Sequence, residues 1–282
     1  MNTKNIVQVL LGEFIYGGHL LSLGAVGIVY SVMMLYSFKF DIRFLISVYL
    51  IAHAVYFYNR IKDYKSDRLT NSKRSMHLKR YDNYFFSIIV FYVIFTFLIL
   101  VSFNNLFSAG AGFLILLFGI LYSEYFKDVT RKYLGFKNYY VAFFWATLVL
   151  YAVLYYHGLF NLTTLIFFIF VFLRWMINTT FFDIKDIKSD IDNGLRTIPA
   201  HFGKEKTLKI LGLLNLFSFL PILIGVYFNL FPTYFLSFFV FYFYSLYYMR
   251  RAMLENSSIQ SLSYIVVDGE YVLWPIILTL FK

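Results

Sequence analysis

The sequence contains no cysteine, so disulfide bonds, thiolate chemistry and cysteine-ligated zinc or iron–sulfur sites are excluded. Charged residues are scarce: they make up 14% of the 282 residues, where an ordinary soluble chain has about 25%. Only four prolines are present, and no proline- or glycine-rich linker interrupts the chain. We therefore expect a single domain over residues 1–282.

Apolar side chains are present in large excess. Hydrophobic residues make up 60% of the chain and aromatic residues 23%. A water-soluble core cannot bury this much apolar surface, so the composition predicts an integral membrane protein and excludes disordered, collagen-like and coiled-coil chains. The net charge of +10 would suggest nucleic acid in a soluble protein. In a membrane protein its distribution matters more, and we expect no nucleic-acid partner.

Nine segments are apolar over a length that can cross the hydrocarbon layer, which takes about 20 helical residues. The predicted fold is all-α, a polytopic membrane protein with nine transmembrane helices. Short, nearly uncharged connections alternate with long polar ones, as helices that run up and down require. The predicted spans are 14–38, 42–58, 83–103, 105–123, 139–157, 159–178, 208–230, 232–249 and 263–281.

The basic residues predict the orientation of these spans. Of the 25 Lys and Arg residues, 22 lie in the N-terminal stub or in and around the four long connections. The positive-inside tendency places the N-terminus and these connections in the cytoplasm and the C-terminus outside. The predicted location is the cytoplasmic membrane. No cleavable signal peptide is apparent, so the first span is expected to remain as an anchor.

Five of the ten aspartates lie in two segments, each where an apolar helix reaches the predicted cytoplasmic side. In the first segment, Asn59, Asp63 and Asp67 are four residues apart and would form one stripe on a continuing helix. Aspartates of the second segment, three and four residues apart, also share a helical face. They are Asp183, Asp186 and Asp190.

These segments offer oxygen ligands with no His or Cys nearby, which suits Mg²⁺. Two facing stripes could hold metal ions that bridge a diphosphate and neutralise the charge of a leaving group. Either segment alone could equally be a solvated helix end whose carboxylates pair with interspersed lysines. Two segments in register on the same side favour the metal site.

At this point the sequence resembles the UbiA superfamily of intramembrane prenyltransferases. In that family N-x-x-x-D-x-x-x-D follows the second helix and D-x-x-D-x-x-x-D follows the sixth. The stretch from Gly194 to Pro199, followed by Phe202 and Gly203, is similar to the family sequence after the second motif. With nine spans, the resemblance covers nearly the whole chain. One departure is the absence of the proline found in many members near the position matched by Arg74.

The resemblance implies a UbiA-like bundle around a central cavity and a Mg²⁺-dependent transferase that faces the cytoplasm. Its partners would be an isoprenyl diphosphate donor, a lipophilic acceptor and membrane lipids. The implied metal ligands are Asn59, Asp63, Asp67, Asp183, Asp186 and Asp190, of which Asp63, Asp67, Asp186 and Asp190 are catalytic. The implied diphosphate-binding cations are Arg74, Lys127 and Arg196, with Arg131 and Lys185 as alternates and Arg174 as a further candidate.

Arg174 lies inside a predicted span, one turn before Asn178. Charges within membranes usually face inward, so both side chains could face the cleft. The alternative is that Arg174 extends to the interface.

Alternatives stay open at two levels. An aromatic acceptor of the quinone-precursor type is the first choice, and a glycerol-phosphate ether lipid or a carotenoid end group are the others. Donor chain length, the aromatic residues facing the carbocation and the oligomeric state stay open. From other classes, a transporter would place charges near the bilayer midplane and break its helices with Gly or Pro. A catalytically silent scaffold would not require two acidic stripes.

Overall fold

The computed structural model describes residues 3–63, 71–103, 105–254 and 258–282. Within these ranges the chain is helical and contains no strand, which confirms the predicted all-α class. Seven of the described helices are long and apolar enough to cross a membrane, or eight if one bent pair counts as a span. The predicted number of nine is therefore approximate. One predicted span is divided between η5 (Thr233–Phe239) and α12 (Val240–Met253), and neither is long enough alone.

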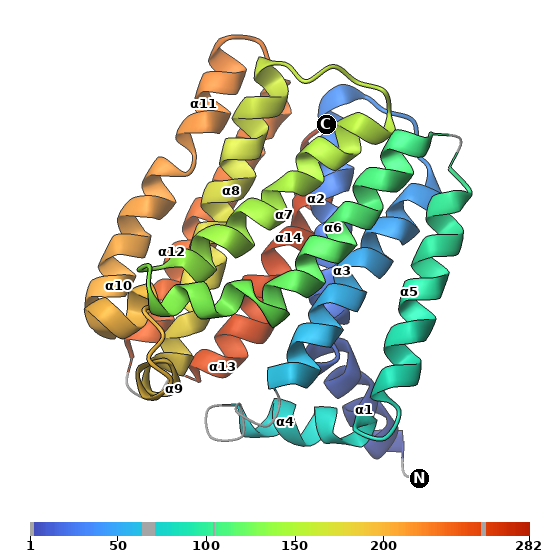
Figure 1. Cartoon of the computed structure of the whole chain (residues 1–282). Coiled ribbons are helices and arrows are strands. Elements are labelled where there is room, and N and C mark those ends of the chain that lie inside the picture. The colour runs from blue at the N-terminus through green and yellow to red at the C-terminus, as the bar shows by residue number, and fades with distance from the viewer. Residues whose placement is uncertain (1–2, 64–70, 104, 255–257) are drawn as a thin grey trace.

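The long helices form an elongated bundle, and most short elements gather at the end that carries the N-terminus (Figure 1). The C-terminus lies toward the opposite end. The bundle is built from α2 (His19–Tyr36), α3 (Ile42–Asp63), α5 (Phe85–Val101), α6 (Leu106–Glu124), α7 (Phe136–Tyr155), α8 (Leu162–Asp183), α10 (Ile198–Phe217) with its short continuation α11 (Leu220–Tyr227), α12 and α14 (Asp268–Phe281). The short elements are α1 (Thr3–Tyr16), α4 (Ser72–Leu78), η2 (Lys79–Tyr81), η3 (Phe126–Arg131), η4 (Ile184–Asp186), α9 (Ile187–Asp192), α13 (Ile259–Ser261) and η6 (Leu262–Val267).

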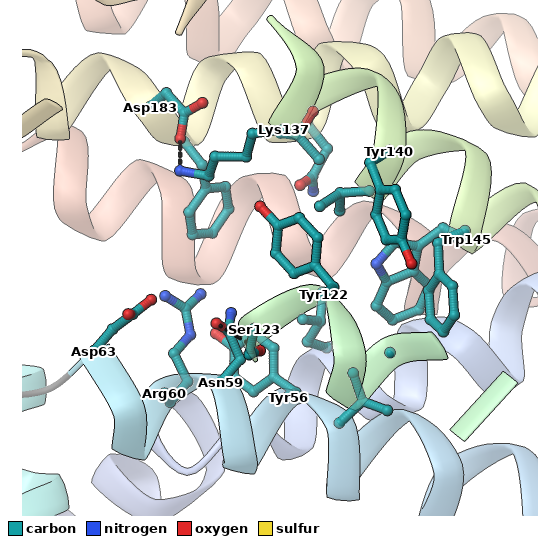
Figure 2. Close-up of a pocket in the computed structure, with 18 of the residues that line it drawn as sticks. Tyr56, Asn59, Arg60, Asp63, Tyr122, Ser123, Lys137, Tyr140, Trp145 and Asp183 are labelled. Atoms are coloured by element: carbon teal, nitrogen blue, oxygen red, sulfur yellow. Dashed lines mark hydrogen bonds and ion pairs between the residues drawn. The ribbon is translucent and has the colours of Figure 1, made fainter. Parts of the chain in front are cut away.

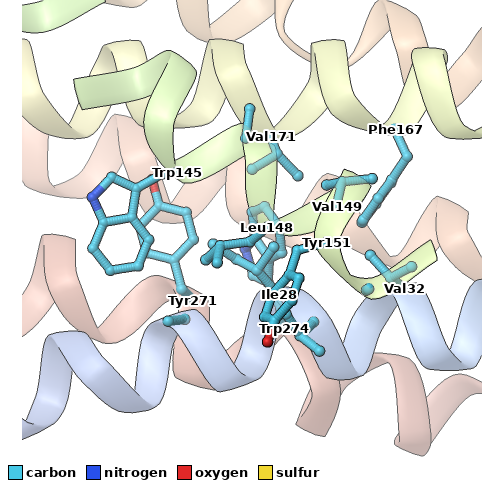
Figure 3. Packing of buried hydrophobic residues seen from close by; sticks show 14 of the residues in the cluster. Ile28, Val32, Trp145, Leu148, Val149, Tyr151, Phe167, Val171, Tyr271 and Trp274 are labelled. Atoms are coloured by element: carbon cyan, nitrogen blue, oxygen red, sulfur yellow. The ribbon is translucent and has the colours of Figure 1, made fainter. Parts of the chain in front are cut away.

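The core lies between α2, α7, α8 and α14, and aromatic rings fill much of it (Figure 3). Trp175 stacks on Trp145 with ring centroids 3.9 Å apart and on Tyr271 with centroids 4.5 Å apart. A glycine lets α2 approach α14 closely, because a Cβ on Gly27 would lie 2.1 Å from the carbonyl oxygen of Tyr271. Small residues commonly permit such close packing between membrane helices. The first and last long helices are thereby joined.

The first predicted span, 14–38, is not one helix. α1 ends at Tyr16, α2 begins at His19, and Gly18 between them has φ of 96°. A side chain is sterically unfavourable in this left-handed region. It would also clash, because a Cβ on Gly18 would lie 2.2 Å from Cδ1 of Tyr56. The membrane-crossing helix therefore begins at His19, and α1 is a separate element.

A polar cluster attaches α1 to α4 and η2. The Glu13 carboxylate accepts a hydrogen bond of 2.8 Å from Nε2 of His77 and another from the Tyr81 hydroxyl, and His19 lies 3.6 Å away. Burial alone would raise the pKa of Glu13, but the bonds from His19, His77 and Tyr81 outweigh it and hold this pKa well below its usual range. The cluster therefore stabilises the fold above the ordinary pKa of a glutamate, and this stabilisation is lost as the pH falls toward the lowered pKa.

The break at Gly18 leads to a first prediction. Gly18→Ala is expected to lower the free energy of unfolding by about 2–4 kcal/mol, from left-handed strain together with overpacking against Tyr56. Thermal unfolding of the detergent-solubilised protein measures this loss. The matched control is Gly212→Ala in α10, where an added Cβ meets nothing within 4 Å. Equal melting temperatures for the two variants would contradict this account of the break.

Candidate active site

A cavity lies toward the end of the bundle that carries the N-terminus, and both acidic segments line it. Asp63 and Arg60 project from α3 on one side, and Asp183 and Lys137 lie on the other (Figure 2). The structure thus brings together two segments that are far apart in the sequence. The residues of these segments that line the cavity are Asn59, Asp63, Asp183, Asp186 and Asp190.

The deeper part of the cavity is apolar. Trp175, which lines it, precedes Asp183 by eight residues on α8, or about 12 Å at the helical rise of 1.5 Å per residue. Apolar side chains from α2, α3, α6 and α7 complete this part. They include Leu21, Ile51, Val55, Ile115, Phe144, Trp145 and Leu148. The cavity therefore combines a polar mouth with a chamber suited to a hydrocarbon chain.

Helices α3 and α6 position the first acidic segment. Asn59 accepts a hydrogen bond of 3.2 Å from the Ser123 hydroxyl of α6. An ion pair of 2.6 Å between Lys62 and Glu124 joins the same two helix ends. Asp63 is the last residue of α3. Asp67 lies outside the described residues, so the predicted stripe is seen only at its first two positions.

Asp183 is almost fully buried and accepts hydrogen bonds from two residues of α7. The Lys137 ammonium group lies 2.5 Å from one carboxylate oxygen, and the Asn138 amide donates to the other over 2.8 Å. The lysine side chain remains 24% exposed, and it lines the cavity. This pair fixes a cation beside the carboxylates of the second segment.

Asp186 belongs to η4 and is held from two directions. Lys185 forms an ion pair with it. Asn71, which precedes α4, donates a hydrogen bond of 3.1 Å from its amide to Asp186. The Asn71 amide oxygen in turn accepts a bond of 2.7 Å from the Tyr264 hydroxyl. The segment after the first motif and the last part of the chain thus orient a carboxylate of the second motif.

Asp190, on α9, is oriented by the turn that leads to α10. The Thr197 hydroxyl donates a hydrogen bond of 2.8 Å to its carboxylate. The backbone N–H of Leu195 donates to the Asp190 carbonyl over 2.8 Å, and Gly194 adopts a positive φ of 67°. The Gly-Leu-Arg-Thr sequence noted above therefore forms the turn that returns Thr197 to Asp190.

Two of the predicted diphosphate-binding cations line the cavity, namely Arg74 and Lys185. Arg74 is 2% exposed, and its guanidinium lies 5.2 Å from the centre of the Tyr264 ring. Arg60 also lines the cavity and was not predicted. Its guanidinium lies 4.3 Å from the centre of the Tyr56 ring.

Other predicted cations do not line this cavity. Arg131 is exposed and pairs with Asp128 at 3.6 Å. Arg196 donates a hydrogen bond of 3.2 Å to the backbone carbonyl of Lys132. Both arginines are therefore at the protein surface, outside the cavity lining. The side chain of Lys127 is outside the described part of the structure.

Arg174 is in the core instead of the cleft. Its guanidinium forms an ion pair of 2.7 Å with Glu270 of α14 and donates to Asn215, Ser218 and Ser245. Neither Arg174 nor Glu270 is appreciably exposed. Arg174 does face inward, as expected of an intramembrane charge. Its partners, however, are structural groups of α10, α12 and α14.

The residues at the mouth fit Mg²⁺, which the resemblance implies. The available donors are carboxylate and amide oxygens, the ligands of hard cations. Within the described ranges, no three His, Asp or Glu side chains come close enough to hold an ion by themselves. Mg²⁺ usually takes one or two carboxylates and completes its octahedron with water and phosphate oxygens, so the fit rests on the oxygen donors alone.

Asp268 is a cavity residue that the sequence analysis missed. It is 4% exposed, lines the cavity and accepts a hydrogen bond of 3.3 Å from the Asn178 amide. A signal was present in the sequence, because Asp268 and Glu270 are acidic residues inside a predicted span, and such residues are rare and usually functional. Arg60 directly follows Asn59 in the first motif and could have been considered with it.

Comparisons with known proteins agree with this architecture. The family model described as the UbiA prenyltransferase family matches residues 11–263. A search of curated proteins finds no match. Among solved structures, the chain is similar to an apo UbiA homologue from Aeropyrum pernix K1. The TM-score is 0.69 and the identity 16%, over 92% of this chain and 96% of that one.

A second similar structure is a digeranylgeranylglyceryl phosphate synthase, with a TM-score of 0.58 and 15% identity. This match covers 95% of the present chain and 99% of the other. At these levels of identity, the two structures support the shared fold and not a shared substrate.

Proposed function

The chain belongs to the UbiA prenyltransferase family of membrane enzymes, and from this premise we propose that it transfers an isoprenyl chain from an allylic diphosphate to a lipophilic acceptor. The observation that carries the proposal is that both acidic segments line a single cavity, whose interior is apolar. A diphosphate would occupy the polar mouth, and its hydrocarbon tail would extend past Trp175.

Residues of the mouth would hold the diphosphate. Asp63, Asp186 and Asp190, with Asn59 and Asp67, would ligate Mg²⁺, which when bound neutralises the charge that develops on the leaving group. Arg74, Lys185 and Arg60 would contact the remaining phosphate oxygens. Arginine favours bidentate contacts with phosphate, whereas lysine acts as a point charge. Asp183 would keep Lys137 directed at the same region.

The apolar chamber would protect the allylic cation from water. Tyr56, Tyr122, Tyr140, Trp145 and Trp175 line the cavity and present aromatic rings to it. Such rings stabilise a neighbouring cation through their negative faces. Exclusion of water would also prevent loss of the cation to hydrolysis.

The acceptor class is proposed by analogy with the family, and the orientation from the distribution of basic residues. An aromatic acceptor of the quinone-precursor type remains the first choice, by analogy with the family. A glycerol-phosphate ether lipid or a carotenoid would be handled by the same chemistry. The basic connections favour a mouth that faces the cytoplasm. A transporter is less well supported, because the carboxylates cluster at one end of the bundle instead of near its midplane.

The test is incubation of purified protein in detergent with MgCl₂ and labelled allylic diphosphates of graded length, each paired with a phenolic, a glycerol-phosphate and a carotenoid acceptor. Extraction and chromatography of the lipids identify the product. We expect labelled product with one acceptor class and stoichiometric release of diphosphate. Absence of both product and diphosphate release with every donor would disprove the proposal, and Mg²⁺-independent substrate counterflow in liposomes would favour a transporter.

A further inference from the structure

Asp268 is an acidic residue of the cavity that belongs to neither acidic segment. It begins α14, directly after the π-helical element η6. π-helical turns inside α-helices are frequent at functional sites because they redirect side chains. Asp268 lines the cavity, whereas Glu270, two residues later, forms the buried pair with Arg174. The two carboxylates of α14 therefore have different roles.

The depth of Asp268 can be read from its partner on α8. Asn178, which donates to Asp268, precedes Asp183 by five residues, or about 7.5 Å along the helix. It follows Trp175 by three residues, or about 4.5 Å. Asp268 thus lies between the diphosphate region and the apolar chamber. This is the depth at which the first carbon of a bound isoprenyl chain would meet its acceptor.

Cations from three elements line the same cavity as Asp268. They are Arg60 of α3, Arg74 of α4 and Lys185 of η4, and Tyr56 is a further titratable residue of this lining. A bound diphosphate would compete for the same cations. Asp268 would then be the acidic group of the cavity that is left facing the chamber. A carboxylate there accepts hydrogen bonds and donates none.

Resting on the proposed function, we propose that Asp268 receives the hydroxyl group of the acceptor and removes its proton as the new bond forms. The acceptor class is therefore a phenol or an alcohol. A hydrocarbon end group, as in a carotenoid, offers no hydrogen-bond donor to this carboxylate. Asn178 holds Asp268 in position from α8.

The allylic C–O bond breaks, and its electron pair leaves with the diphosphate. The acceptor O–H bond also breaks, and its proton passes to the Asp268 carboxylate. The released electron pair forms the bond to the first isoprenyl carbon, either from the oxygen or from the ring carbon conjugated with it. In the second case that ring carbon then loses its hydrogen as a proton and the oxygen regains one, so one proton is released overall by either route. Asp268 returns the proton to water when the product leaves.

The experiment separates ionisation of the donor from transfer to the acceptor. Asp268→Asn keeps the shape of the side chain and a hydrogen-bonding oxygen but removes the base. We expect the turnover number for prenyl transfer to fall by about 10²–10⁴-fold, the usual contribution of a general base. Mg²⁺-dependent release of diphosphate from the donor without acceptor should change by less than about 3-fold, since this step needs no base on the acceptor side. Asp128→Asn, an exposed surface residue, is the matched control and should alter neither rate.

A second measurement uses the unmodified protein and therefore does not depend on the folding of a variant. The accepted phenol or alcohol is compared with its O-methyl ether, which keeps the oxygen and the carbon skeleton, adds one methyl group and has no proton to give. The ether should be neither prenylated nor an effective competitor, with an inhibition constant at least about 10-fold higher, the worth of one hydrogen bond to a charged group.

The possible outcomes are distinct. Parallel loss of transfer and diphosphate release in Asp268→Asn would show that Asp268 only balances Arg60, Arg74 and Lys185, and would overturn the inference. Unchanged transfer in this variant, or prenylation of the ether, would also overturn it. If the unmodified protein releases no diphosphate from any donor, the proposed function itself is disproved, independently of the role of Asp268.

Discussion

Asp190→Asn is expected to reduce the rate of prenyl transfer by about 10²–10³-fold, because it removes one negative ligand from a metal–diphosphate site without changing the shape of the side chain. Asp190 lines the cavity and is oriented by Thr197. Initial rates at saturating donor concentration measure the loss. Because amide and carboxylate have similar volumes, the melting temperature should change little.

Asp192→Asn provides the matched control. Asp192 lies on the same short helix, two residues away, but it is exposed and does not line the cavity. Its replacement should leave the rate within a factor of about 2, as expected for a solvated surface charge. A similar loss in both variants would mean that total acidity at the mouth matters, and not the position of Asp190.

Removal of the metal gives the same expectation by another route. EDTA should abolish turnover of the unmodified protein, and excess MgCl₂ should restore it, since Mg²⁺ neutralises leaving-group charge that the cations of the protein do not neutralise alone. Full activity in metal-free buffer would contradict the proposed roles of both acidic segments.

Arg174→Met is expected to cause the largest loss of stability, about 3–5 kcal/mol, because it leaves Glu270 as an uncompensated buried charge. Both partners of this ion pair have less than 4% of the side chain exposed. Thermal or denaturant unfolding in detergent would measure the effect. The double variant with Glu270→Met should recover most of the lost stability, since it removes both charges together.

The control for this prediction is Arg43→Met. Arg43 also pairs with an acidic residue, Asp41, at 3.0 Å, but its side chain is 55% exposed. Surface ion pairs contribute about 0–1 kcal/mol, so the melting temperature should hardly change. If the Arg174 variant and the double variant were equally unstable, packing around the guanidinium and not charge compensation would explain the loss.

The sequence was sufficient to predict the fold class and to predict that the two acidic segments face one another across one cavity. In a membrane, a long apolar segment can form all of its backbone hydrogen bonds only as a helix or within a closed barrel. The length of the apolar segments therefore indicates the fold class. Asp63 and Asp186 were identifiable because their spacing repeats on a helix face. Both kinds of signal are local along the chain.

The remaining features depend on contacts between distant segments. Gly18 ends α1 because the Tyr56 ring occupies the space that a side chain would need, and no local pattern announces this. Arg174 was assigned to the cleft, although its ion pair with Glu270 across a helix interface places it in the core. Asp268 was not identified, because its place in the cavity depends on Asn178 of another helix. Local spacing therefore identifies candidate charges, whereas their partners decide which charges serve the cavity and which serve the core.

The close packing of α2 against α14 at Gly27 has a consequence for biosynthesis. α14 is the last described helix to leave the ribosome, yet it contributes Asp268 to the lining of the cavity and contacts α2, the earliest membrane-crossing helix. Before α14 is inserted, Gly24 and Gly27 of α2 lack the helix that packs against them, and Arg174 lacks its ion-pair partner Glu270. The protein must therefore keep α2 available until α14 has been made, and the bundle is completed only when α14 is inserted.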